Sequence, residues 1–153
     1  MSEIFPMIPA SPKPLWILGG ILLLLLALLG LFSYIAYSSR TVQFELSREG
    51  LRVRGGLYRR MVPTESLIVE KAKHIDLREP TSYKPRLRTN GIGLPGYASG
   101  WFRLRNGEKA LLYVTDVSNV VYVPTREGYS LLLSVAQPES FLQSIRNIST
   151  GGA

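Results

Sequence analysis

The basic side chains have the types and spacing most suited to chemistry, and they gather in one part of the chain. Residues 40–88 contain 12 Lys+Arg and 6 Asp+Glu, whereas residues 89–153 are nearly neutral. Side chains two positions apart in a strand lie on one face, so Arg52 with Arg54, and Lys71 with Lys73, are predicted to share faces. Guanidinium and ammonium groups recognise phosphate and other anions. The candidate anion-contact residues are therefore Arg40, Arg48, Arg52, Arg54, Arg59, Arg60, Lys71 and Lys73.

A second interpretation of these basic residues stays open. Arginine at alternate positions is also typical of the solvated face of an antiparallel sheet. A solvated face can also touch a lipid surface, so the pattern alone does not distinguish an anion-contact surface from an ordinary solvated face.

The sequence gives little support to catalysis or to a bound cofactor. It has no Cys and one His, His74, which excludes disulfides, thiolate zinc sites and mechanisms that need two histidines. The spacing of His74, Asp76 and Ser82 or Ser130 does not support a triad. We expect no enzyme activity, no catalytic residue, no metal and no cofactor.

Residues 91–96 (GIGLPG) match the glycine pattern of dinucleotide-binding loops, but Pro95 interrupts them and no strand–helix–strand unit surrounds them. These glycines are expected to permit a bend or a close backbone approach. Trp101 and Phe102 would face opposite sides of a strand, which argues against a stacking platform for nucleic acid.

Residues 15–37 form an uncharged apolar run that predicts one transmembrane helix. Trp16, Tyr34 and Tyr37 stand at its ends, where aromatic rings anchor at headgroups. Residues 1–14, with four prolines, are expected to be an irregular tail. The arginines that follow the run place the C-terminal domain in the cytoplasm of a single-pass cell-membrane protein and the N-terminus outside. Two alternatives remain open: cleavage of a signal peptide at Ala36-Tyr37-Ser38, which has small residues at the positions that a peptidase prefers, and an extracytoplasmic domain on the same anchor.

Residues 41–148 change to the alternating pattern of strands. Hairpins are predicted around residues 48–50, at Asn106-Gly107 and around residues 126–128, with a weaker strand over residues 69–77. Residues 138–148 predict an amphipathic helix, and residues 149–153 a disordered tail. The fold class is mainly β: about seven antiparallel strands that close into a barrel, with a C-terminal helix.

Several blocks of this region resemble the bacterial pleckstrin-homology-like (PH-like) domain family. They are residues 88–97 (RTNGIGLPGY), 100–102 (GWF), 110–116 (ALLYVTD), 122–125 (YVPT) and 138–142 (PESFL). The resemblance implies a PH-like barrel in a membrane-associated, non-catalytic module.

Two functions follow as expectations. In the first, the basic barrel lies against anionic lipid headgroups of the bilayer and recruits or steadies another protein there. In the second, the barrel and helix are a structural subunit of a larger membrane complex, and the contact with lipid charge is incidental. Neither involves nucleic acid.

Overall fold

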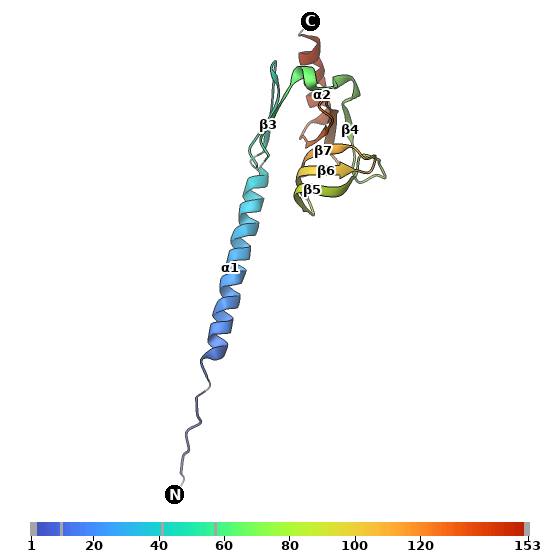
Figure 1. Cartoon of the computed structure of the whole chain (residues 1–153). Helices are drawn as coiled ribbons and strands as arrows, with labels where there is room; N and C mark the ends of the chain where they lie inside the picture. Colours follow the sequence, from blue (N-terminus) through green and yellow to red (C-terminus); the bar gives the residue numbers. More distant parts are fainter. Residues whose placement is uncertain (1–2, 10, 41, 57, 152–153) are drawn as a thin grey trace. The chain divides into compact units, whose positions relative to one another are not determined.

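The computed structural model describes residues 3–9, 11–40, 42–56 and 58–151. The chain divides into two compact units, Met1–Tyr37 and Ser38–Ala153. Figure 1 shows the elements of each unit along the chain. The second unit contains the whole buried core, so its fold does not depend on the apolar helix.

Helix α1 spans Lys13–Arg40, so it is longer at both ends than the predicted range of 15–37. Pro14 is tolerated because the first turn of a helix needs no backbone N–H donor. By length and composition the stretch Lys13–Tyr37, 25 residues with a mean hydropathy of 2.8, is a candidate membrane span. Its large apolar side chains are exposed throughout the unit.

A three-stranded antiparallel sheet begins the second unit. It has the order β1 (Gln43–Ser47), β2 (Gly50–Arg54) and β3 (Arg60–Pro63). The predicted β1–β2 hairpin is confirmed, with Leu51 and Val53 buried and Arg52 and Arg54 exposed. β3 ends at Pro63, which has no backbone N–H to donate to a neighbouring strand.

The second sheet has six strands in the order β4 (Lys73–Ile75), β8 (Val120–Pro124), β9 (Ser130–Ser134), β7 (Lys109–Val114), β6 (Tyr97–Leu104) and β5 (Pro85–Leu94). The hairpins β6–β7 and β8–β9 are confirmed. Neighbours are antiparallel except β7 and β9, which are parallel.

The prediction of a closed barrel with about seven strands was wrong. The described chain has nine strands in two sheets, and the barrel stays open. The physical reason lies after Pro63: residues Thr64–Ser66 (η1) and Val69–Lys71 (η2) form 3-10 turns instead of a continuous strand. In the described part of the chain, Leu67 and Thr125 form one isolated antiparallel bridge outside the named strands. Lys71 and Lys73 consequently do not share a strand.

Helix α2 (Pro138–Thr150) closes one face of the six-stranded sheet. Leu142 and Ile145 pack into a core with Leu51, Leu131 and other apolar side chains. A second core, which includes Phe102, covers the opposite face. The predicted helix thus continues past residue 148, where the Thr150 hydroxyl donates to the Arg146 carbonyl, so residues 149 and 150 are not a disordered tail.

Candidate anion-binding groove

Four of the predicted arginines line one groove on the three-stranded sheet. The groove has a volume of about 470 Å³, and its lining includes Arg52, Arg54, Arg59, Arg60 and Met61. Gly55 and Gly56 turn the chain after β2 with φ of 82° and 68°, a conformation that glycine adopts without strain. This turn brings Arg59 beside the end of β2.

The register of β2 and β3 decides which side chains face outward. Arg52 pairs with Met61, and the Arg52 guanidinium lies 3.5 Å from the Met61 sulfur. Met61 is 38% exposed, so it adds an apolar surface next to the cationic one. The sequence reasoning did not identify Met61, because only strand pairing places it opposite Arg52.

Arg54 is partly neutralised. Its Nε lies 2.7 Å from a carboxylate oxygen of Glu45 on β1, and both side chains are about half exposed. Arg52 and Arg59 form no ion pair within the described residues. The free cationic capacity of the groove therefore belongs mainly to Arg52 and Arg59.

Arg60 has a different environment from its neighbours. It pairs with Val53 on the inner side of the sheet, and its guanidinium carbon lies 5.0 Å from the Tyr129 ring centroid and 5.5 Å from that of Trp101. Glu127 lies 3.6 Å away. These contacts engage the charge of Arg60 although its side chain is 43% exposed, so it is a structural residue at the groove wall.

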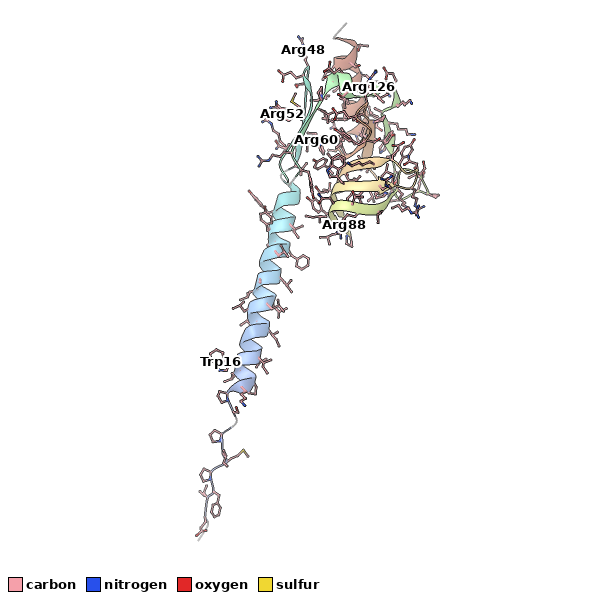
Figure 2. The ribbon with its side chains drawn as sticks, in the orientation of Figure 1. Trp16, Arg48, Arg52, Arg60, Arg88 and Arg126 are labelled. Atoms are coloured by element: carbon pink, nitrogen blue, oxygen red, sulfur yellow. The ribbon has the colours of Figure 1, made fainter. Side chains whose placement is uncertain are left out.

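The remaining predicted basic residues lie apart from this groove. Arg48 is at the tip of the β1–β2 hairpin, as Figure 2 shows, and Lys71 belongs to η2. The Lys73 amine on β4 donates to the Tyr83 hydroxyl at 2.8 Å and lies 4.3 Å from the Tyr83 ring centroid. The Arg40 side chain is outside the described residues.

The predicted aromatic anchors all lie on α1. Trp16 is near the start of the helix (Figure 2), and Tyr34 and Tyr37 are in its last turns; Trp16 is 82% exposed in the unit. Their role as anchors at the headgroups stays a prediction.

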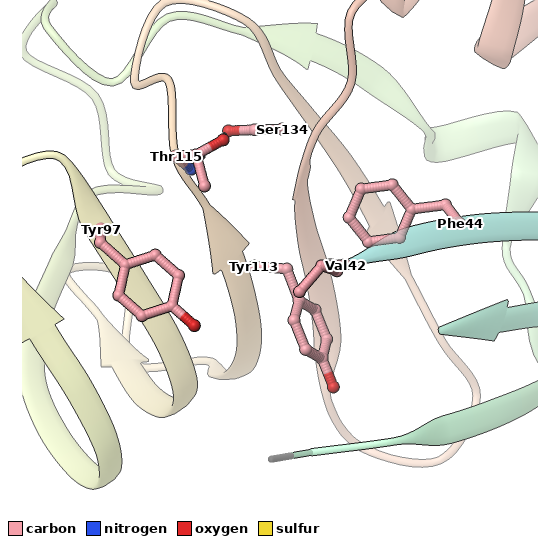
Figure 3. A pocket seen from close by; sticks show the side chains of 6 residues that line it. All are labelled: Val42, Phe44, Tyr97, Tyr113, Thr115 and Ser134. Carbon is pink, nitrogen blue, oxygen red and sulfur yellow. Dashed lines mark hydrogen bonds between the residues drawn. The ribbon is translucent and has the colours of Figure 1, made fainter. Parts of the chain in front are cut away.

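A small cavity inside the domain is too small for an organic ligand. It measures about 40 Å³ and is lined by Val42, Phe44, Tyr97, Tyr113, Thr115 and Ser134 (Figure 3). That volume is on the scale of one water molecule. The Tyr113 hydroxyl donates to the Tyr58 carbonyl, and burial raises the pKa of Tyr113, which keeps this donor protonated.

His74 joins elements of the fold. Its Nε2 lies 3.0 Å from the Ser118 carbonyl and its Nδ1 lies 3.5 Å from a carboxylate oxygen of Glu139 in α2. Within the residues that the structure describes, no group of three His, Cys, Asp or Glu side chains is placed to hold a metal ion.

The family assignment comes from comparison with known families. A family model described as a bacterial PH domain matches residues 42–148. The chain belongs to the bacterial PH domain family. Neither the comparison with curated proteins nor the comparison with solved structures gives a match. The PH domain therefore covers all nine strands and most of α2, and PH-like domains are generally non-catalytic modules.

Proposed function

We propose that this protein is a single-pass membrane protein whose PH domain lies against an anionic membrane surface, with Arg52, Arg54 and Arg59 as the contact residues. The observation that carries the proposal is their convergence, with Met61, on one open groove. Each basic residue near an anionic leaflet contributes about 1 kcal/mol. Guanidinium groups meet the phosphates, and the Met61 side chain adds apolar contact.

The position of the groove along the chain supports this role. Five residues separate Tyr37 from Gln43, and Gln43 is the register partner of Arg54. Since an extended chain covers at most about 3.5 Å per residue, these five residues limit how far Gln43 can lie from Tyr37. A helix that spans a bilayer would therefore keep the groove close to the headgroups.

Vesicle binding tests the proposal. Residues 38–153 form a compact unit with its own core and can be studied alone. We expect this domain to sediment with vesicles of phosphatidylglycerol and phosphatidylcholine, but not with pure phosphatidylcholine, and to lose binding as salt rises. Arg52→Glu with Arg59→Glu should weaken binding about tenfold or more, since two contacts of about 1 kcal/mol each are lost.

A matched variant controls for net charge. Arg126→Glu with Arg146→Glu makes the same charge change at two exposed positions outside the groove, and should change binding less than about twofold. Equal losses in both variants would mean that total charge, and not the groove, attracts the domain. Absence of binding to anionic vesicles at low salt would reject lipid contact.

The second candidate function, a subunit of a larger membrane complex, is favoured by one observation. The open barrel leaves sheet edges that a closed barrel would lack. In that case full-length protein would be recovered in a discrete larger assembly whose stability changes little with salt, because apolar interfaces are weakly screened.

A further inference from the structure

We propose that the free edge of β5 binds an extended acidic segment of a partner protein, which adds to the six-stranded sheet as a seventh strand. The inference rests on the second candidate function, contact with other proteins, and names the chemistry of the partner. It does not require that the groove bind lipid.

The first argument is the backbone of β5. With ten residues it is the longest strand of the described chain, it lies at the end of the sheet, and within the described residues it pairs only with β6. The opposite end of the same sheet is β4, which has three residues. An edge strand directs alternate N–H and C=O groups away from its sheet, where another strand can pair with them. A lipid headgroup has no matching row of donors and acceptors.

The regular part of this edge is its second half. Shifts of register occur between Pro85 and Leu87 and between Arg88 and Asn90, whereas Asn90 to Leu94 pair with β6 without interruption. Bulges disturb the pairing of an edge. We therefore expect backbone pairing along residues 90–94, and side-chain contacts along residues 84–88.

Exposed apolar side chains on β5 would be covered by a strand added at this edge. Leu87 is 58% exposed and Leu94 is 41% exposed, which is high for leucines within a strand. Gly91 and Gly93 have no side chains to hold a partner backbone away.

The charge around the edge selects an acidic partner. Lys84, Arg86 and Arg88 lie on or next to β5, and Arg103 and Arg105 lie on or next to β6. None of these five side chains forms an ion pair within the described part of the chain, and the sequence from residue 85 to residue 104 contains no Asp or Glu. Pairing of β5 with a second copy of itself would bring like charges together. Figure 2 shows Arg88 on this strand.

Defined peptides test strand addition on the full chain in phosphatidylcholine nanodiscs. The probe is a ten-residue peptide that alternates Glu with Val and Thr, capped at both ends and fluorescently labelled. Two further peptides replace every Glu by Lys, or carry N-methyl groups at alternate residues that remove N–H donors without changing the charge. We expect saturable binding of the first peptide, at least about tenfold weaker binding of the other two, and slower hydrogen exchange in residues 90–94 when the first is bound.

Protein variants locate the site. Arg86→Glu with Arg88→Glu should weaken binding of the acidic peptide about tenfold, whereas Arg126→Glu with Arg146→Glu should leave it within about twofold. Absence of binding, or equal binding of the N-methylated peptide, would overturn strand addition. If the β5 variant binds the peptide normally but loses anionic vesicles, the edge is a lipid surface and the inference is wrong. The groove variant Arg52→Glu with Arg59→Glu should bind the peptide normally, so failure of lipid contact and failure of strand addition give different results.

Discussion

Arg59 and Arg60 are adjacent in the sequence, yet the structure gives them different roles. Arg59 is exposed in the groove, whereas the guanidinium of Arg60 lies 5.0 and 5.5 Å from two aromatic ring centroids. A cation beside an aromatic face contributes about 0.5–2 kcal/mol, depending on its desolvation. Folding stability and surface binding therefore depend on different arginines.

Replacement of Arg60 is predicted to affect stability. Arg60→Ala should lower the free energy of unfolding of residues 38–153 by about 1–2 kcal/mol, because contacts with Trp101, Tyr129 and Glu127 are lost. Arg59→Ala is the matched control and should change it by less than about 0.5 kcal/mol. Urea denaturation followed by tryptophan fluorescence measures both, since Trp101 is the only tryptophan of this unit. Equal effects would show that the ring contacts of Arg60 contribute nothing.

Asp116 is predicted to make stability depend on pH in acid. Its carboxylate accepts hydrogen bonds from the Ser118 hydroxyl, the Asn119 side chain and the Ser118 backbone, which lower its pKa from the ordinary value of 3.8 to about 2. Because the folded state has the lower pKa, this contribution is complete above about pH 4 and is lost as pH falls towards 2.

Thermal unfolding of the domain between pH 2 and pH 5 measures this dependence. Asp116→Asn should flatten the decrease of the unfolding temperature in that range, since Asn does not titrate. An unchanged slope would show that other carboxyl groups cause the acid sensitivity.

At the scale of elements, the β5–β6 hairpin depends on two glycines that face each other. Gly91 is the register partner of Gly100. A Cβ added to Gly100 would lie 2.5 Å from the Asn90 carbonyl oxygen and 2.6 Å from the Gly91 Cα, and Gly100 has φ of 117°. The strands of this hairpin can therefore approach closely only without side chains at this point.

Gly100→Ala is predicted to destabilise the domain by about 3 kcal/mol, since both the clash and the backbone conformation oppose it. Gly107→Ala, in a turn with φ of 88° but nothing within 4 Å, should cost only about 1 kcal/mol. Chemical denaturation measures the difference between the two variants. A Gly100→Ala domain as stable as the Gly107→Ala domain would contradict the close approach.

At the scale of the whole molecule, the order of the two units determines where the PH domain is displayed. The basic residues after the apolar helix predict that the domain is cytoplasmic and the N-terminus outside. Since the chain has no Cys, Met7→Cys and Ser144→Cys give single thiols in the exposed parts of each unit. In intact cells an impermeant maleimide should label Met7→Cys alone, and Ser144→Cys only after the membrane is opened.

Other labelling patterns have clear meanings. Labelling of Ser144→Cys in intact cells would place the domain outside the cytoplasm. Loss of the Met7→Cys label together with a shorter mature chain would identify the apolar segment as a cleaved signal peptide.

The local features were predictable because they depend on neighbours in the sequence. The apolar stretch that forms α1, the β1–β2 hairpin, the turn at Asn106-Gly107 and the start of α2 at Pro138 follow from periodicity and turn chemistry. The same holds for the opposite orientations of Trp101 and Phe102, which are adjacent residues of one strand. The blocks that resemble bacterial PH domains agree with the family shown for residues 42–148.

Other features depend on residues far apart in the sequence, and only the tertiary structure decided them. Periodicity cannot show that the 3-10 turn Val69–Lys71 takes the first part of the strand predicted over residues 69–77 and leaves only β4. Nor can it show that β7 pairs in parallel with β9, or that the barrel stays open. Periodicity also does not distinguish among the eight basic residues that were predicted to contact anions. The tertiary structure distinguishes them. Arg52 faces outward beside Met61, and Arg54 forms an ion pair with Glu45. Arg60 contacts the ring of Trp101 in β6 and the ring of Tyr129 just before β9. Sequence alternation assigns a side chain to a face, but its partner on that face depends on which distant strand packs there.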